Sequence, residues 1–350
     1  MTARLPVVVL GATGVVGQRF LRRLAAHPRF EVAHVCASEK SAGKRLKEAA
    51  TWRLGGEEWA GLGDRVVAAC DPDRAFAPVA FSALDADVAR EVEPRYAERG
   101  ALVFSNASAF RMEPDVPLLI PEVNAPHLAL VHEQRRRRGR RGAIVCNPNC
   151  TATVLASALA PLRDVFGVEA AAMTSLQAVS GAGYPGVASL DVLGNVVPFI
   201  RNEEAKVEEE TPKMLGRLEG GRVAPHPLAV SAACLRVAVV DGHTEAVSAR
   251  LVGAPSPAAV REAFAGWRPP PIASGLPSAP RRAVVLHDAD DRPQPRLDAE
   301  SDGGLATHVG RVRACALFGV KFVVLGHNAE RGAAGASVLN AELALAEGLL

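Results

Sequence analysis

The stretch Pro6-Val7-Val8-Val9-Leu10-Gly11-Ala12-Thr13-Gly14-Val15-Val16-Gly17 decides how the first half of this chain folds. Its apolar β-branched run predicts a strand, and the helical spacing of apolar side chains over residues 15–26 predicts a helix. Glycines between a strand and a helix let the backbone approach a pyrophosphate, which the helix N-terminus favours. The alternative is an ordinary turn, but the strand–turn–helix order favours a dinucleotide site. Its expected contacts are Gly11, Thr13, Gly14, Val15, Val16 and Gly17.

Strand and helix signals keep alternating through the first half of the chain. Further strands are predicted at residues 30–37, 79–82, 101–105 and 143–146. Alternation of this kind predicts βαβ units, and so an α/β domain with a Rossmann-type parallel sheet.

The pattern changes after Gly167. Strands are predicted at residues 168–179, 235–240, 245–252, 283–287 and 309–324, some of the later ones interrupted by turns, with a glycine loop at 180–186 and a helix from Val187. Consecutive strands of this kind predict a second domain of α+β type with a mixed sheet. The alanine- and leucine-rich residues 333–350 predict a helix that returns to the first domain.

Composition excludes several classes of protein. The 350 residues fit two domains, and 49% apolar with 22% charged residues is typical of a soluble globular chain. A net charge of +2 gives no electrostatic case for a nucleic-acid or membrane partner. Six cysteines without paired spacing, and no leader-like start, indicate a reducing compartment, so we expect a cytoplasmic protein. The segment 133–141 holds six arginines and is interpreted as a solvated loop, with nucleic-acid binding as the minor alternative.

The end of the second predicted strand indicates which dinucleotide binds. An NAD site usually places an acid there to hold the ribose 2′-hydroxyl. Here Ser38 and Ser41 offer two hydroxyls and Lys40 and Lys44 offer two positive charges, which suit a 2′-phosphate. Glu39 could serve as the acid of an NAD site, and a solvated polar loop is the other alternative. We expect NADP as the cofactor.

Cys150 is the candidate nucleophile. It follows a predicted strand and the turn Asn147-Pro148-Asn149, and it precedes a predicted helix. A helix N-terminus stabilises a thiolate. Cys146 lies inside the strand and is expected to be buried and inert, and the two cysteines lack the further ligands that a metal site needs. No metal is expected.

His243 is the candidate acid/base partner of the thiol. It lies in a predicted turn between two strands, seven residues after Arg236, whose guanidinium suits a carboxylate. A plain turn histidine is the alternative, and His226 and His287 are the nearest rivals.

Short motifs in order along nearly the whole chain resemble the aspartate-semialdehyde dehydrogenase family, in the branch that includes archaeal and fungal enzymes. The segments that carry the resemblance are Gly11-Ala12-Thr13-Gly14-Val15-Val16-Gly17-Gln18, Ser105-Asn106-Ala107-Ser108, Ile120-Pro121-Glu122-Val123-Asn124, Asn147-Pro148-Asn149-Cys150-Thr151, Gln177-Ala178-Val179-Ser180-Gly181-Ala182-Gly183, Asp241-Gly242-His243-Thr244, Arg292-Pro293-Gln294-Pro295-Arg296, Gly326-His327-Asn328 and Arg331-Gly332-Ala333-Ala334-Gly335-Ala336.

The resemblance implies a role for each of these residues. Catalysis would rest on Cys150 as nucleophile, His243 as acid/base and Gln177 as the group that orients the substrate. Substrate and phosphate would be held by Arg236, Glu203, Arg111, Lys206 and Asn149, and the cofactor also by Ser180, Gly181 and Asn328. The Glu203–Lys206 spacing puts both side chains on one helical face. The outer glutamates of residues 203–210 are interpreted as a solvated charged face.

The resemblance also implies the reaction and the assembly. Residues 1–149 with 327–350 would form the NADP-binding domain, and residues 150–326 the catalytic and oligomerisation domain of a homodimer or homotetramer. The reaction would be the reversible, NADP-dependent reduction of 4-phospho-L-aspartate to its semialdehyde through a cysteine thioester, with release of phosphate. The rival enzymes are malonyl-CoA reductase and N-acetyl-glutamyl-phosphate reductase, and the rival of another class is a non-catalytic NADP-binding redox sensor.

Overall fold

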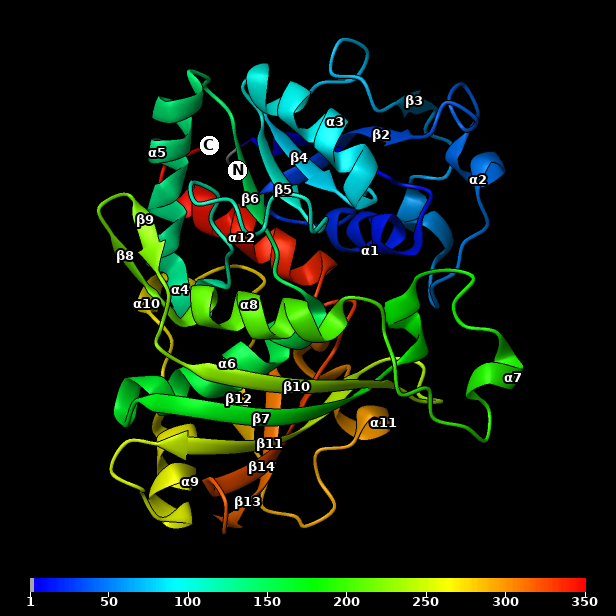
Figure 1. Ribbon diagram of the computed structural model, residues 1–350. Helices are drawn as coiled ribbons and strands as arrows, with labels where there is room; N and C mark the ends of the chain where they lie inside the picture. The colour runs from blue at the N-terminus through cyan, green and yellow to red at the C-terminus, as the bar shows by residue number, and fades with distance from the viewer. Residues whose placement is uncertain (1–2) are drawn as a thin grey trace.

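The strand β1 (Leu5–Leu10) lies inside a parallel six-stranded sheet in the order β3-β2-β1-β4-β5-β6. This computed structural model describes residues 3–350 (Figure 1). The other strands of the sheet are β2 (Phe30–Ala37), β3 (Val67–Ala69), β4 (Val79–Ser82), β5 (Leu102–Ser105) and β6 (Ala143–Cys146). The order is that of a dinucleotide-binding doubly wound fold, so the predicted Rossmann-type sheet is confirmed.

Helices cover both faces of this sheet. On one face, α1 (Val15–Leu24) packs against α12 (Ala334–Ala346), and their apolar side chains share a buried cluster with Val7 and Val9 of β1. On the other face, α3 (Ala86–Glu98) packs on β5 and β6. Short helices α2 (Leu46–Ala49) and α4 (Pro121–Asn124), and the longer α5 (Leu130–Arg138), complete this half. The chain therefore returns to its first sheet at α12, as expected from the sequence.

A second sheet has the order β10-β7-β11-β14-β13-β12. The pairs β10–β7 and β12–β13 are parallel and the other neighbours are antiparallel, so the predicted mixed sheet is confirmed. Its strands are β7 (Val168–Gln177), β10 (Ala229–Arg236), β11 (His243–Leu251), β12 (Val284–Leu286), β13 (Thr307–Cys315) and β14 (Gly319–Gly326), and β8 (Arg217–Glu219) pairs with β9 (Arg222–Ala224) as a separate hairpin.

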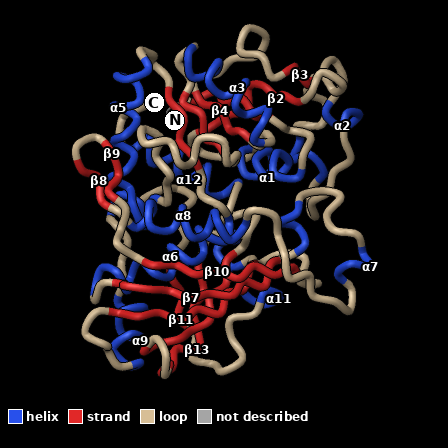
Figure 2. Tube along the Cα trace, viewed as in Figure 1, coloured by secondary structure: helices blue, strands red, loops and turns tan. Residues whose placement is uncertain are grey.

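The helix α6 (Cys150–Val165) joins the two halves of the molecule. Every residue of α6 from Thr151 to Leu162 is buried, which is typical of a helix with partners on all sides. It packs against α8 (Glu203–Leu215), α9 (Pro257–Gly266) and the second sheet. Figure 2 shows α6 and α8 between the two groups of strands. The first residue of α6 therefore lies between the two sheets. Short helices α7 (Ser189–Val192), α10 (Pro271–Ser274) and α11 (Pro295–Asp298) lie in connecting segments.

The arginine-rich segment was wrongly interpreted as a loop, because α5 continues through it to Arg138. Its Gln134 is buried and hydrogen-bonds to the backbone of Asp115 and Ile144. Two of the arginines, Arg136 and Arg137, pair with Glu133 one helical turn earlier. Leu130 and Val131 at the start of α5 are buried as well, and Gln134 adds hydrogen bonds that attach the helix to β6.

Two other predictions of secondary structure were wrong in part. The strand expected at 235–240 is the end of β10, which begins at Ala229, because its pairing with β7 ends where Arg236 meets Gln177. The helix expected from Val187 is the single turn α7. The segment 309–324 holds the hairpin β13 and β14, in line with strands interrupted by turns. Among residues 3–350, none of the helices has the length and apolar character needed to cross a bilayer.

Candidate active site

Cys150 is the first residue of α6, directly after the strand β6 and a three-residue turn. The side chain of Asn149 caps the helix by accepting a hydrogen bond from the Ala152 N–H at 3.0 Å. A capped helix start fixes the position of the thiol and places it at the positive end of the helix dipole. Cys150 is half-buried, whereas Cys146 in β6 is fully buried, as expected for an inert cysteine.

His243 faces this thiol from the first residue of β11. Its Nε2 atom lies 3.3 Å from Cys150 Sγ, and its Nδ1 atom accepts the Ala178 N–H at 3.2 Å. A ring whose Nδ1 lone pair is occupied carries its hydrogen on Nε2, the atom that faces the sulfur. Burial, followed by the charges of Arg236 and His327, lowers the pKa of His243 to about 3. The imidazole is therefore neutral at physiological pH and presents an N–H donor to the reacting atoms.

The thiol itself is protonated in the resting site. Burial and the neighbouring Glu203 carboxylate raise the pKa of Cys150 to about 12, while Arg111 and hydrogen bonds from Thr151 oppose this shift. The helix start and the Nε2–H of His243 favour the thiolate once a substrate is in place.

A buried hydrogen-bond network surrounds the Cys150–His243 pair. Glu203 Oε1 accepts from Asn149 at 2.9 Å, from the Thr151 hydroxyl at 3.0 Å and from Gln177 at 3.1 Å. The same Gln177 amide also donates to Thr151 Oγ1 at 2.8 Å. These contacts join α6, β7 and α8, so the three elements hold one another in register around the thiol.

Arg236 extends the network at the end of β10. Its Nη1 donates to the Ala178 carbonyl at 2.7 Å and lies 3.5 Å from Gln177 Oε1. Gly181 leaves room for it, because a Cβ atom there would lie 2.9 Å from Arg236 Nη1 and 3.2 Å from His243 Nε2. The guanidinium is buried beside the thiol pair, which is the place for a group that binds a substrate carboxylate.

The predicted phosphate ligands lie on the α8 side of the thiol. Arg111 donates to Glu210 Oε1 at 3.1 Å and to the Asn106 carbonyl at 2.8 Å. Lys206 Nζ is 3.9 Å from Glu203 Oε2, so this pair shares one helical face as predicted. The eight predicted catalytic and substrate-binding residues therefore belong to one connected cluster.

Sequence reasoning missed several members of this cluster. Glu210 is buried and accepts the Asn149 N–H at 2.6 Å, so the view of it as a solvated glutamate was wrong. A signal was present, because Glu203, Val207 and Glu210 share one helical face. Gly332 was noted only as part of a motif, yet a Cβ atom there would lie 2.4 Å from Cys150 Cβ.

Two further groups gave no sequence signal of their role. Lys213 is buried and donates to the carbonyls of Arg111, Glu113 and Val116, which fixes the Arg111 loop. Glu245 is buried two residues after His243, and neither of its oxygens has a hydrogen-bond partner among the described residues. Burial and Glu203 raise the pKa of Glu245 well above its usual value, so this carboxyl is protonated.

A large cleft runs along the glycine turn and opens toward the second half. Its volume is about 960 Å³, and Gly11, Thr13, Gly14, Val15 and Val16 line it. Gly11 has φ +79°, and a Cβ atom at Gly17 would lie 2.1 Å from the Gly11 carbonyl oxygen. Gly14 is the N-cap of α1 and, as a glycine, provides no side-chain cap for this helix. The site therefore leaves backbone N–H groups free for an anionic pyrophosphate.

The predicted 2′-phosphate residues lie at one end of this cleft. Ser38 and Glu39 line it, while Ser41 and Lys44 stand in the turn that follows and lie outside the lining. Ala182, Gly183 and Tyr184 of the glycine loop form part of its opposite wall.

The remaining predicted cofactor residues lie between the cleft and the thiol. Asn328 donates to the Ser180 hydroxyl at 2.8 Å and accepts the Gly242 N–H at 2.9 Å. These contacts tie the segment after β14 to the glycine loop and to the turn before His243. The rival histidines have other partners, since His226 contacts the Val168 carbonyl and His287 contacts His308.

Comparisons with known proteins identify the family. Residues 6–131 match the semialdehyde dehydrogenase NAD-binding domain, and residues 159–330 match the semialdehyde dehydrogenase dimerisation domain. The chain is 51% identical to the aspartate-semialdehyde dehydrogenase of Methanothermobacter thermautotrophicus over 96% of this chain and 98% of that one. It is 47% identical to the enzyme of the same name from Archaeoglobus fulgidus over 99% of this chain and 100% of that one.

A solved structure agrees with these sequence matches. The crystal structure of aspartate-semialdehyde dehydrogenase with NADP from Candida albicans superposes with a TM-score of 0.91 at 41% identity, covering 99% of this chain and 100% of that chain. Both the archaeal and the fungal likeness expected from the motifs are thus confirmed. The chain belongs to the aspartate-semialdehyde dehydrogenase family.

Proposed function

We propose that this chain catalyses the reversible, NADP-dependent reductive dephosphorylation of 4-phospho-L-aspartate to L-aspartate 4-semialdehyde, with Cys150 as the nucleophile. The observation that carries the assignment is the 3.3 Å contact between Cys150 Sγ and His243 Nε2 at the start of α6. A thiol beside an imidazole N–H is suited to covalent acyl transfer. The relatives that match over their full length carry the name of this activity.

The chain's own residues account for the acyl-transfer half of the reaction. Sγ of Cys150 attacks the acyl carbon, the acyl–phosphate bond breaks, the thiol proton leaves on the departing phosphate as HPO₄²⁻, and a thioester remains on the sulfur. NADPH supplies the hydride that reduces this thioester. The Nε2–H of His243 then stabilises the oxyanion of the thiohemiacetal, whose collapse breaks the C–S bond and releases the aldehyde.

Polar groups around the thiol suit the ends of the substrate. Arg236 binds the α-carboxylate, and Glu203 binds the ammonium group, because each is buried beside Gln177 with the appropriate charge. Lys206 and Arg111 bind the phosphate that leaves, and Asn149 positions it near the thiol. A serine in place of Cys150 would give an ester, which is a poorer hydride acceptor than a thioester.

NADP occupies the glycine-lined cleft, held by Gly11, Thr13, Gly14, Val15, Val16 and Gly17 at the pyrophosphate, by Ser38, Ser41 and Lys44 at the 2′-phosphate, and by Ser180, Gly181 and Asn328 toward the thiol. Residues 1–149 and 327–350 then form the cofactor domain, and this division is supported by the packing of α12 on α1 and β5. Residues 150–326 carry the thiol and the mixed sheet, and they form the contacts of a homodimer or homotetramer.

The test is reduction of NADP by the purified chain with L-aspartate 4-semialdehyde, with and without inorganic phosphate. We expect NADPH to form only when phosphate is present. The Cys150→Ala variant should lose this activity. The control Cys315→Ala, which changes the last residue of β13, should keep it. A folded chain without turnover would contradict the proposal, and malonyl-CoA with NADPH would then be the next substrate to test.

A further inference from the structure

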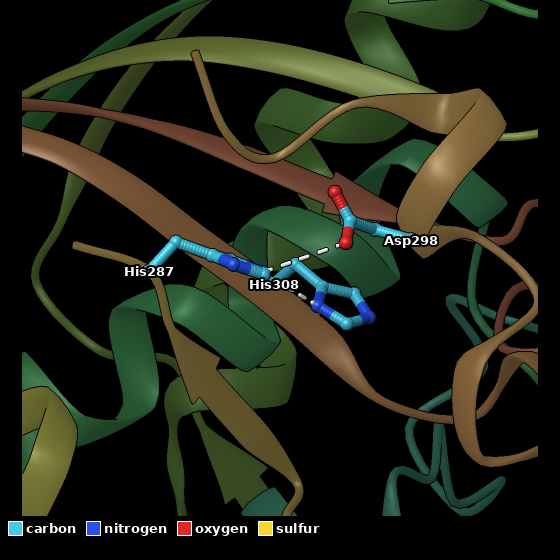
Figure 3. Close-up of side chains that lie close together, drawn as sticks. All are labelled: His287, Asp298 and His308. Atoms are coloured by element: carbon cyan, nitrogen blue, oxygen red, sulfur yellow. Dashed lines mark hydrogen bonds and ion pairs between the residues drawn. The ribbon is translucent and has the colours of Figure 1, made fainter. Parts of the chain in front are cut away.

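A second cluster of ionisable side chains lies away from the thiol, at the edge of the mixed sheet. His287 follows β12, His308 belongs to β13, and Asp298 ends α11. One nitrogen of each ring and one carboxylate oxygen lie within 4.8 Å of one another. Figure 3 shows the two imidazoles and the carboxylate next to each other, joined by contacts at His287. We propose that these three side chains bind a divalent transition-metal ion of the zinc type.

The hydrogen bonds of His308 leave a lone pair on its Nδ1 atom, on the side that faces His287. Its Nε2 atom lies 2.8 Å from the Ser301 hydroxyl, and its Nδ1 atom lies 3.0 Å from His287 Nε2. When Nε2–H donates to Ser301, Nδ1 carries a lone pair that points at His287. Without an ion, the Nε2–H of His287 donates to this lone pair. When His287 carries its hydrogen on Nδ1 instead, both Nε2 of His287 and Nδ1 of His308 have lone pairs that can bind the ion. Such outer hydrogen bonds commonly orient metal-bound histidines.

The carboxylate of Asp298 is fixed but not saturated. Its Oδ2 accepts the Gln294 N–H at 2.7 Å and Arg292 Nε at 2.8 Å, and its Oδ1 accepts the other arm of the Arg292 guanidinium. A carboxylate offers about four acceptor positions, so about one remains on Oδ1. That oxygen lies 3.9 Å from His287 Nε2, a separation that one ion can bridge. The Arg292 guanidinium holds the Asp298 carboxylate in position to bind the ion, although the positive charge of Arg292 reduces the affinity for a cation.

The ligand set and its surroundings suit zinc. Two neutral imidazoles, one carboxylate and a water make a common four-coordinate zinc site. His308 and Asp298 are buried, and burial lowers the pKa of His308 to about 4, so its ring is neutral at physiological pH. The side chain of His287 is 15% exposed, which gives the ion a route from solvent.

A bound ion would join β12, β13 and α11 behind the catalytic histidine. Pro295 and Ala299, at the start of α11 and just after it, contact Gly242, where an added Cβ would lie 3.2 Å from each of their Cβ atoms. Gly242 directly precedes His243. The ion therefore acts as a structural clamp on the wall that supports His243, and the chemistry at Cys150 does not require it.

The test uses the Cys150→Ala protein, because Cys150 and His243 could themselves bind zinc. We expect one equivalent of Co²⁺ to give the visible bands of a tetrahedral site, and one equivalent of Zn²⁺ to displace it. Excess Zn²⁺ should raise the melting temperature by about 5 °C, since the ion binds only the folded chain. The inference is independent of the proposed reaction, because the variant is inactive by design.

Two variants and a control decide the outcome. His308→Gln and His287→Gln should each weaken Co²⁺ binding about tenfold or more and remove the thermal shift. His287→Gln alters the more exposed ligand, so it remains informative if His308→Gln folds poorly. His132→Gln changes an exposed histidine on α5 and should leave binding intact. Absence of Co²⁺ bands, or bands that persist in both ligand variants, would overturn the proposal.

Discussion

The thiol site and the nucleotide cleft are built on opposite principles. Around Cys150, buried side chains such as Gln177 and Glu203 are hydrogen-bonded to one another across three elements. Along the cleft, Gly11 and Gly14 present bare backbone where the turn meets α1, and the polar side chains at its end are exposed. At the first site, side chains held by hydrogen bonds are positioned for the reaction, whereas the second site is an open cleft that the cofactor can enter. Substitutions should therefore affect turnover in the first site and cofactor binding in the second.

The largest effect is expected for His243→Asn at the thiol site. Removing the Nε2–H that faces Cys150 should lower kcat by about 10²–10⁴-fold, with a small change in the KM for NADP. The pKa of His243 is lowered to about 3, so the wild-type rate should show no loss from His243 protonation between pH 5 and 8. Steady-state kinetics across this range check both points, with His132→Asn as the control. A rise in the KM for NADP at unchanged kcat would contradict the assignment of turnover to the thiol site and of cofactor binding to the cleft.

Two glycines of the same turn should have different roles: Gly17 allows the turn to fold, and Gly14 allows the cofactor to approach. In Gly17→Ala the new Cβ would meet the Gly11 carbonyl, so we expect a melting temperature lower by about 5 °C as well as weaker NADP binding. In Gly14→Ala the nearest atom is the Gly11 oxygen at 3.5 Å, an ordinary contact, so the fold should be unaffected while the KM for NADP rises about tenfold. Calorimetry and kinetics together test the pair. Equal melting temperatures for both variants would count against this account.

A smaller effect is expected at the exposed end of the cleft. Ser38→Ala removes a hydroxyl that lines the cleft and should raise the KM for NADP by about three- to tenfold, because one hydrogen bond to a charged group is lost. Lys44→Ala should change it less, since Lys44 lies outside the lining and its charge is screened by solvent. Kinetics with NAD in place of NADP provide the control. A similar loss with both cofactors would exclude recognition of the 2′-phosphate by these residues.

The smallest effect on activity is expected for Glu245→Gln, a neutral replacement of a protonated carboxyl. The folded pKa of Glu245 is raised, so unfolding releases its proton at any pH above the usual carboxyl range. The wild-type free energy of unfolding should therefore fall as pH rises above about 4.5, by at most about 1.4 kcal/mol per pH unit from this group. Glu245→Gln should remove this slope and keep kcat within about twofold. Denaturant unfolding from pH 5 to 8 measures the slope, and a variant with the wild-type slope would show that Glu245 is ionised in the fold.

Local patterns predicted more of this molecule than long-range contacts did. The glycine turn, the Cys150 helix start and the helical character of the last segment depend on neighbours in sequence, and the structure has each where the pattern indicated. The resemblance implied that Arg236 and Gln177 both act on the substrate, and they lie 3.5 Å apart although 59 positions separate them. The residues whose roles were missed act over long distances, since Glu210 reaches the Asn149 N–H and Lys213 reaches the Arg111 loop. Neither composition nor periodicity indicates that a buried charged side chain will hydrogen-bond to a particular backbone group far away in the sequence.

The wrong predictions have the same physical origin. The arginine run of α5 has no apolar stripe, so periodicity could not separate it from a loop, and the buried side chains Leu130, Val131 and Gln134 explain its place in the fold. The His287–His308–Asp298 cluster also arises from strand pairing, because β12 and β13 bring together side chains 21 positions apart.

The return of α12 to the first sheet has a consequence for how the chain is made. Residues 334–344 are all buried, and they cover apolar side chains near α1 and β5. About 190 residues are synthesised between β6 and this helix. Part of one face of the nucleotide sheet, beside α1, therefore stays uncovered in the nascent chain until α12 emerges from the ribosome. That interval is when chaperones would be needed, and a stop codon before Ala334 should give an insoluble product rather than a working cofactor domain.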